Sequence, residues 1–253
     1  MIKMIATDLD GTLLRYNKTI SRYTASILRR CIDKGIKIVI ATARPIRAVK
    51  MLEIPIIFEA SIYHNGAVID DGHENILHFG IPSQSIQDIV AIAFQNDAKA
   101  RVFIEINDNI YGNSDASDLW PGTEVNLTDF SNLPLGPADK IILIESDMHK
   151  IETIRKTLPK NLYLETSENT VGMIMNKDAT KKNAIKQLCK MFSMSQDEVV
   201  AFGDDYNDIK MLEFCGIGVA VANAIDEVKA VANFICGTNE HDGVAKWIEE
   251  NIL

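Results

Sequence analysis

The sequence predicts an α/β fold in which a doubly wound parallel sheet is interrupted by a second, smaller α+β unit. Three observations support this prediction. Short apolar runs alternate with amphipathic stretches of helical spacing at both ends of the chain. Acidic, hydroxyl or basic residues come directly after several of the apolar runs. Between residues 82 and 177 the pattern changes to hairpins and irregular segments rich in Gly, Pro and Asp.

The first elements form a strand, a helix and a second strand. The apolar run of residues 4–6 predicts a strand, and residues 21–34, with apolar side chains at helical spacing, predict a helix that stops at a glycine. Residues 36–41 are apolar and mostly β-branched, as expected of a strand buried on both faces. Strands joined by a helix are parallel, and open α/β sheets bind ligands at the carboxyl ends of such strands. We therefore expect Asp8 and Thr42, which follow these two strands, to lie at the same edge of the sheet.

The winding continues on either side of the insertion. We expect a helix over residues 45–52, a short strand near 56–58, and a hairpin over 67–79 whose turn contains Asp-Gly. His64-Asn65-Gly66 is interpreted as a tight turn, with a ligand-facing role as the alternative. After residue 177 helices and strands alternate again. We expect helices over residues 181–192, 209–212, 224–232 and from 243 onward, and strands over residues 199–202, 217–221 and 234–235.

The inserted segment has the pattern of a separate domain. We expect helices over residues 83–97 and 149–158, and strands over residues 101–106, 140–145, 162–164 and 171–175. Gly80-Ile81-Pro82 predicts a hinge at its start. We therefore place an inserted α+β domain at residues 82–177 and the main domain at residues 1–81 and 178–253. Trp120-Pro121-Gly122 is interpreted as a turn with an aromatic anchor rather than as a substrate loop.

Composition excludes several classes of partner. The net charge of −9 and the absence of a basic run argue against binding to nucleic acid or to an anionic membrane surface. The four cysteines are widely spaced and indicate buried thiols in a reducing compartment rather than a zinc site or disulfides. No apolar stretch approaches the ~20 residues of a spanning helix, and no signal-like segment opens the chain, so we expect a cytoplasmic protein. The oligomeric state stays open.

The acidic residues after the strands carry the chemistry. Asp8 and Asp10 stand one residue apart and repel each other unless one is protonated or a cation lies between them, which favours a hard divalent metal such as Mg2+. Taken alone, this pair is equally consistent with a solvated turn. The whole set holds four carboxylates, one hydroxyl and one ammonium, from Asp8, Asp10, Asp204, Asp208, Thr42 and Lys181. That combination predicts a phosphoryl-transfer site.

With these residues in place, the sequence resembles the haloacid dehalogenase-like hydrolase superfamily, and in particular its Cof-type phosphatases. Members of this family have a Rossmann-like core and a large type-C2 cap inserted between the second and third motifs. Asp8-Leu9-Asp10-Gly11-Thr12 matches the first motif, Thr42 the second and Lys181 the third. Gly203-Asp204-Asp205-Tyr206-Asn207-Asp208 matches the fourth. The resemblance spans the whole chain.

The chain departs from the family pattern at three positions. Ala43 stands where glycine is common, and Asp205 also replaces a usual glycine. Lys182 stands where a glycine usually follows the lysine of the third motif, which leaves two candidates for the inward-pointing ammonium. Thr180 and Ala184 keep the usual offsets around Lys181 and favour it.

The resemblance implies a role for each motif residue. The implied catalytic residues are Asp8 as nucleophile, Asp10 as acid and base, Thr42 as a donor to the phosphoryl group and Lys181 as its neutralising cation. The implied substrate-binding residues are Thr42, Arg44, Lys181 and Asn207. Mg2+ would be held by Asp8, the Asp10 carbonyl, Asp204 and Asp208, the last holding either the lysine or a metal-bound water. Two of these roles have alternatives, because Arg44 could instead cap a loop and Asn207 could cap the next helix.

The function that follows is Mg2+-dependent hydrolysis of a small phosphorylated metabolite, for example a sugar phosphate, through an aspartyl-phosphate. One alternative is a hexose-phosphate mutase-like phosphotransferase, since such mutases share these motifs. Another is a phospho-accepting switch of the receiver type. The inserted domain and the base at Asp10 both argue against the switch, because receivers are compact domains and a base shortens the life of the phosphoaspartate.

Overall fold

The computed structural model describes residues 1–73, 76–167 and 171–253. The chain forms two compact units, one made of Met1–Leu77 and Thr180–Leu253 and the other of His78–Ala179. The second unit therefore interrupts the sequence of the first between Leu77 and Thr180. The domain limits expected at residues 82 and 177 stay a prediction.

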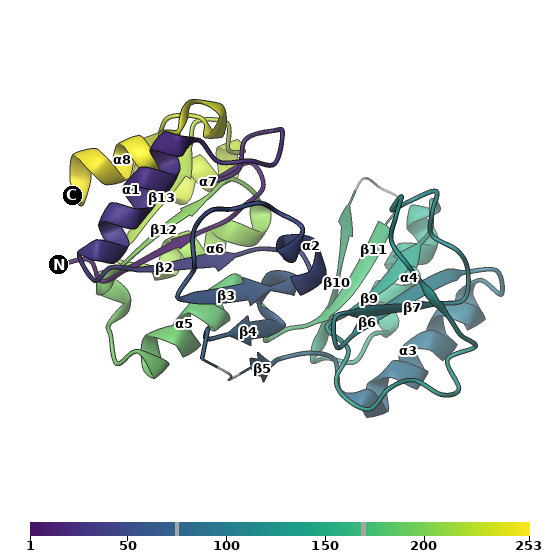
Figure 1. Cartoon of the computed structure of the whole chain (residues 1–253). Coiled ribbons are helices and arrows are strands. Elements are labelled where there is room, and N and C mark those ends of the chain that lie inside the picture. Colours follow the sequence, from purple (N-terminus) through teal and green to yellow (C-terminus); the bar gives the residue numbers. More distant parts are fainter. Residues whose placement is uncertain (74–75, 168–170) are drawn as a thin grey trace. The chain divides into compact units, whose positions relative to one another are not determined.

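The first unit is built on a mixed sheet whose centre is parallel (Figure 1). Among the described residues, eight strands follow the order β14-β13-β12-β1-β2-β3-β4-β5. Their bounds are β1 Met4–Thr7, β2 Lys37–Ala41, β3 Ala60–Tyr63, β4 Val68–Asp70, β5 Ile76–His78, β12 Val199–Gly203, β13 Ile217–Val221 and β14 Phe234–Cys236. All pairs from β14 to β3 are parallel, and β3 pairs antiparallel with β4.

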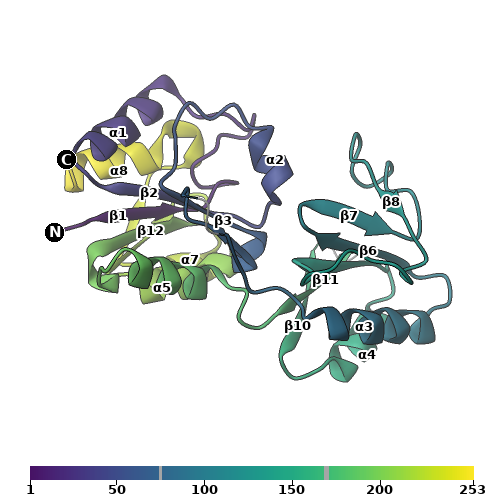
Figure 2. The ribbon, with the colours of Figure 1, turned by 60° about the horizontal axis from the view of Figure 1, so that its bottom comes forward.

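Helices cover both faces of this sheet, as Figure 2 shows for α1 and α8 on one face and α5 and α7 on the other. The helices are α1 Arg22–Asp33, α2 Ile46–Lys50, α5 Lys181–Met191, α6 Ile209–Phe214, α7 Asp226–Val231 and α8 Gly243–Asn251. Short 3-10 turns occupy His64–Gly66, Gln196–Glu198, Tyr206–Asp208 and Asn239–His241. The predicted α/β fold with a doubly wound parallel core is therefore confirmed.

The central strands read as continuous apolar runs because both of their faces are covered. All four residues of β1 and all five of β12 are buried. The helix expected after β1 is α1, whose first turn is capped by the Ser21 hydroxyl accepting from the Thr24 amide. The four cysteines are buried and unpaired, as predicted.

One predicted strand is wrong. Residues 56–58 form no strand, and Ile57 is 90% exposed. The strand lies slightly later, as β3 (Ala60–Tyr63), where Val39 of β2 pairs with Ala60. The apolar residues after Pro55 suggested a strand locally, but pairing with the buried β2 decides where the chain joins the sheet.

The second unit contains its own sheet and core. Its strands, in the order β10-β11-β9-β6-β7-β8, are β10 Leu162–Ser167, β11 Val171–Asn176, β9 Lys140–Ile144, β6 Arg101–Ile106, β7 Asn109–Gly112 and β8 Asn126–Leu127. Helices α3 (Ser83–Asn96) and α4 (Met148–Thr157) pack on one face. On the other face Trp120 stacks edge-on against Phe103 with ring centroids 5.4 Å apart, which confirms the aromatic anchor of the 120–122 turn. Strands β7 and β8 fall in the segment predicted to be irregular.

Candidate active site

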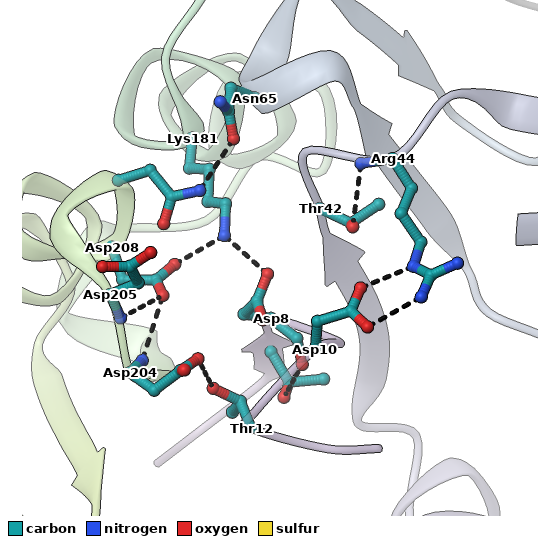
Figure 3. A network of polar contacts seen from close by, with 12 residues as sticks. Asp8, Asp10, Thr12, Thr42, Arg44, Asn65, Lys181, Asp204, Asp205 and Asp208 are labelled. Carbon is teal, nitrogen blue, oxygen red and sulfur yellow. Dashed lines mark hydrogen bonds and ion pairs between the residues drawn. The ribbon is translucent and has the colours of Figure 1, made fainter. Parts of the chain in front are cut away.

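The residues after β1 and β12 and at the start of α5 meet at one edge of the first unit's sheet (Figure 3). The ammonium of Lys181 donates to Asp8 Oδ1 at 2.6 Å and to Asp208 Oδ1 at 2.7 Å. The Lys181 and Asp208 side chains have no exposed surface, and that of Asp8 is 9% exposed. The structure therefore holds a dry cation between two carboxylates that stand 200 residues apart in the sequence.

The position of Lys181 follows from how α5 begins. Thr180 caps the helix, with its hydroxyl accepting from the Asn183 amide. Gly66 packs against this cap, since a Cβ there would lie 2.4 Å from the Thr180 carbonyl oxygen. Lys182 instead points its ammonium toward the Phe214 ring, 5.9 Å from the centroid. Of the two adjacent lysines, Lys181 is thus the one that reaches Asp8.

Asp204 is held beside the first motif by Thr12 and Gly11. The Thr12 hydroxyl donates to Asp204 Oδ1 at 2.6 Å. Gly11 has φ +81°, and a Cβ on it would lie 2.2 Å from Asp204 Oδ2. Glycine is therefore needed here both for its backbone conformation and for the close approach of the carboxylate.

Asp208 supports the loop that carries Asp204. Its Oδ2 accepts from the Asp204 amide at 3.0 Å and from the Asp205 amide at 3.3 Å, while Oδ1 accepts from Lys181. Asp205, the unusual residue of this motif, is exposed and caps the following 3-10 turn through the Tyr206 amide. Its carboxylate thus has a structural contact of its own.

Asp10 turns toward Arg44, whereas Asp8 turns toward Lys181 (Figure 3). Arg44 donates through Nε to Asp10 Oδ2 at 2.5 Å and through Nη2 to Asp10 Oδ1 at 2.7 Å. The Lys18 ammonium also donates to Asp10 Oδ1, at 2.7 Å. The sequence analysis gives Arg44 a role in binding the substrate phosphate, with capping of a loop as the alternative; in this structure its guanidinium forms two hydrogen bonds with the Asp10 carboxylate.

Backbone hydrogen bonds join Thr42, after β2, to β3 and to the turn that follows β3. The Thr42 amide donates to the Ile62 carbonyl at 2.8 Å, and the Asn65 amide donates to the Thr42 carbonyl at 3.0 Å. The Thr42 hydroxyl is buried and accepts from the Arg44 amide at 3.1 Å. The hydroxyl proton is therefore directed away from this amide and can be donated to another group.

The predicted turn at His64–Gly66 is confirmed as a 3-10 turn with left-handed φ at its first two residues. It also has a contact that the turn interpretation does not include. The side-chain amide of Asn207 donates to Asn65 Oδ1 at 2.9 Å. Asn207 is thus oriented by Asn65, and Asn65 is an additional residue of the site.

Burial and like charge shift the pKa values of the acidic residues. Burial raises the pKa of Asp8 to about 8, with Lys181 opposing and Asp208 adding to the rise. Burial also raises the pKa of Asp204 to about 6, although the Thr12 hydrogen bond opposes it. Burial acts to lower the pKa of Lys181, but the adjacent Asp208 and Asp8 outweigh it and raise the pKa, so the ammonium stays charged.

The pKa of Asp10 shifts in the opposite direction, below its usual value. Burial acts to raise its pKa, but the hydrogen bonds from Arg44 and Lys18 outweigh this effect and lower it. Asp10 is therefore ionised at neutral pH in this arrangement.

The acidic residues fit a divalent cation. Among the described residues, Asp8, Asp204 and Asp208 each place one carboxylate oxygen within 4.8 Å of the others. Burial is the main cause of the raised pKa values of Asp8 and Asp204, and the nearby Asp208 carboxylate adds to both. All-oxygen donors of this kind suit a hard ion such as Mg2+. Since both oxygens of Asp208 already accept hydrogen bonds, Asp8 and Asp204 are the carboxylates better placed to bind it.

The sequence-based set and the observed site differ in a few residues. Thr12 and Lys18 belong to the site although the sequence analysis gives neither a role of its own, and Asn65, for which it gives a ligand-facing role only as an alternative, belongs to it too. Thr12 stood inside the first motif and Asn65 beside a glycine after a strand, so each had a local signal. Lys18 had none, because its position depends on the shape of a loop.

Within the described residues, no helix is both long enough and apolar enough to span a membrane.

The chain is similar to known proteins over nearly its whole length. A sequence model of the haloacid dehalogenase-like hydrolases matches residues 5–248. The 5-amino-6-(5-phospho-D-ribitylamino)uracil phosphatase YitU of Bacillus subtilis is 30% identical, over 98% of this chain and 96% of the relative. The pyridoxal phosphate phosphatase YbhA of Escherichia coli is 28% identical, over 99% of both chains.

A solved structure shows the same fold. The structure of SMU.1108c from Streptococcus mutans superposes with a TM-score of 0.84 at 26% identity, covering 99% of this chain and 98% of that one. Taken together with the match over nearly the whole length, these likenesses show that the chain belongs to the haloacid dehalogenase-like hydrolases, in their Cof-type subfamily, and is a phosphatase.

Proposed function

We propose that the protein hydrolyses a small phosphorylated metabolite, such as a sugar phosphate, through an aspartyl-phosphate on Asp8, with Mg2+ as cofactor. The observation that carries this proposal is the buried Asp8 carboxylate, bonded to Lys181 and flanked by Asp204 and Asp208. A carboxylate is a weak nucleophile, and a buried site rich in fixed charges is where it can attack phosphorus.

Asp8, Asp204 and the Asp10 backbone carbonyl are the groups that we propose to hold Mg2+. When bound, the ion would neutralise charge on the phosphoryl oxygens and keep Asp8 ionised. We assign Asp208 to Lys181 rather than to the metal, because its Oδ1 accepts from the ammonium and its Oδ2 from two backbone amides.

In the first step an Asp8 carboxylate oxygen attacks phosphorus, and the bond from phosphorus to the leaving oxygen breaks. Asp10, in its protonated form, gives its proton to that oxygen. The Thr42 hydroxyl donates to a phosphoryl oxygen, and Lys181 neutralises the charge that develops there.

In the second step water attacks the phosphorus of the aspartyl-phosphate, and the electron pair of the broken bond returns to the Asp8 carboxylate. Asp10, now ionised, takes the proton from the water. The hydrogen bonds from Arg44 and Lys18 favour this ionised form, which supports the role of Asp10 as the base of the second step.

Every residue to which we assign a role in the transfer belongs to the unit of Met1–Leu77 and Thr180–Leu253. We therefore propose that the inserted unit, His78–Ala179, acts as a cap that selects the leaving group. Two relatives are named as phosphatases of a phosphorylated ribitylaminouracil and of pyridoxal phosphate, which makes both compounds suitable candidates beside sugar phosphates.

Phosphate release from a panel of such esters, with Mg2+ and with a chelator, tests the proposal. We expect Mg2+-dependent turnover by the wild type and a loss of at least ~10³-fold with Asp8→Asn. Asp33→Asn, which removes an exposed carboxylate at the end of α1, is the matched control and should retain activity. Turnover that needs a bisphosphate activator would instead indicate a mutase, and a phosphoprotein stable for hours would indicate a switch.

A further inference from the structure

Lys18 adopts a backbone conformation that is costly for its residue type. Its φ is +64°, in the left-handed region that glycine and asparagine tolerate best. Such a conformation is strained for other residues and persists only where the surroundings impose it. The lysine side chain at this position therefore needs an explanation other than the backbone.

The loop around Lys18 is held at both its tip and its base. At the tip, the Lys18 amide donates to the Arg15 carbonyl and the Arg15 amide to the Thr19 carbonyl, both at 2.9 Å. At the base, Arg15 Nη2 donates to both carboxylate oxygens of Asp242 at 3.0 Å. The Asn239 side chain also donates to the Leu14 carbonyl, at 2.9 Å. These contacts fix the place from which the Lys18 side chain extends.

Stability does not account for the contact that Lys18 makes. Its ammonium donates to Asp10 Oδ1 at 2.7 Å, with the two side chains 51% and 37% exposed. Ion pairs with this much exposure contribute little to stability, so this pair does not offset the strain of the backbone. The contact is made with the residue that we propose as the acid and base.

The geometry defines what the ammonium does to Asp10. A carboxylate has about four acceptor positions, two on each oxygen. Oδ1 accepts from both Lys18 and Arg44, while Oδ2 accepts from Arg44 alone among the described contacts. Lys18 thus fills the second position of Oδ1 and leaves the second position of Oδ2 for a proton.

We propose that Lys18 is a positioning residue for the phosphatase reaction, which holds Asp10 so that Oδ2 takes the proton of the attacking water. This inference rests on the proposed function of Asp10. In the step concerned, the water oxygen bonds to phosphorus, the bond from phosphorus to Asp8 breaks with its electrons returning to Asp8, and the water proton moves to Asp10 Oδ2. Removing Lys18 frees the Asp10 carboxylate to turn, which slows this step and not the formation of the aspartyl-phosphate from a substrate with a good leaving group.

The test uses Lys18→Asn, because asparagine tolerates the left-handed backbone and carries no ammonium that could reach Asp10. The substrate is 4-nitrophenyl phosphate, whose leaving group needs no acid. With the full-length protein and Mg2+, the amount of phosphoenzyme is measured by acid quench at successive times. We expect it to decay about tenfold more slowly than in the wild type, which is a part of the ~10²–10⁴-fold effect of a positioned base. We expect kcat/KM, which covers only the steps through loss of 4-nitrophenolate, to stay within about twofold of the wild type.

Two further variants complete the design. Lys18→Arg restores a cation at the same place and should recover most of the decay rate. Lys50→Asn removes the same charge from the exposed end of α2 and should leave both rates unchanged.

The outcomes separate the inference from the function on which it rests. A wild-type decay rate in Lys18→Asn, or an equal loss in decay and in kcat/KM, would overturn the role of Lys18. A wild-type decay rate in Asp10→Asn would instead overturn the proposed role of Asp10 itself.

Discussion

Replacing the buried Lys181 tests how strongly the site depends on this internal cation. Lys181→Met keeps the length and much of the volume of the side chain but leaves Asp8 and Asp208 without their shared partner. Neither Lys181 nor Asp208 has exposed side-chain surface, and that of Asp8 is 9% exposed, so water cannot replace the ammonium. Removing one partner of a buried ion pair costs about 3–5 kcal/mol, mostly because the remaining charge is left unpaired.

We therefore expect the free energy of unfolding of the metal-free protein at pH 8 to fall by about 3–5 kcal/mol, measured by urea denaturation. Adding Asp8→Asn to the Lys181→Met variant removes one of the stranded charges and should recover about 1–3 kcal/mol as a coupling energy. With Mg2+ present, the single variant should also lose about 10²–10³-fold in kcat, because a preorganised cation is missing.

Lys182→Met is the matched control, since Lys182 is only half-buried and its ammonium lies 5.9 Å from the Phe214 ring centroid. We expect this change to cost less than about 1 kcal/mol. Equal losses from the two substitutions, or additive effects of Lys181→Met and Asp8→Asn, would refute the account of a dry cation shared by two carboxylates.

Two more outcomes follow from the geometry. The raised pKa values of Asp8, about 8, and Asp204, about 6, exceed the ~3.9 of an unfolded aspartate. Between about pH 4 and about pH 8 the folded protein thus binds more protons than the unfolded chain, so the Tm of the metal-free protein should fall as the pH rises through this range. Mg2+ should raise the Tm more at about pH 8 than at about pH 5. A Mg2+ effect on the Tm that is independent of pH would contradict this. Gly11→Ala should cost more stability and activity than Gly35→Ala. Both glycines have left-handed φ, but a Cβ on Gly11 would lie 2.2 Å from a carboxylate oxygen of Asp204, whereas nothing lies within 4 Å of a Cβ on Gly35. Equal losses in urea denaturation would show that backbone strain alone accounts for both.

The parallel core could be predicted because its signals are local. Buried strands such as β2 are continuous apolar runs, and the polar residues that follow them must share an edge of the sheet. The strand predicted near residues 56–58 failed for the opposite reason, since pairing with β2 decides which residues of that segment join the sheet. Strands β7 and β8 were missed because each is short and gains its pairing from its neighbours.

The site could be predicted as a set of motif residues but not as a set of contacts. The fork of Arg44 on Asp10 and the hydrogen bond of Asn207 to Asn65 join residues 34 and 142 positions apart, and no spacing in the sequence announces them. Lys18 lies only eight positions from Asp10, yet a left-handed turn is what brings its ammonium there. The roles assigned to these residues stay predictions until they are tested.

The most direct test of the central claim is to find the phosphoryl group on Asp8. The wild type is mixed with Mg2+ and 4-nitrophenyl phosphate, quenched in acid within the first turnover, digested and examined by mass spectrometry. The account predicts one added phosphoryl group on the peptide that contains Asp8, and its absence in the Asp8→Asn variant and in the presence of a chelator. Turnover by the wild type with no phosphoryl group on Asp8 at any quench time, while Asp8→Asn still releases phosphate, would contradict it.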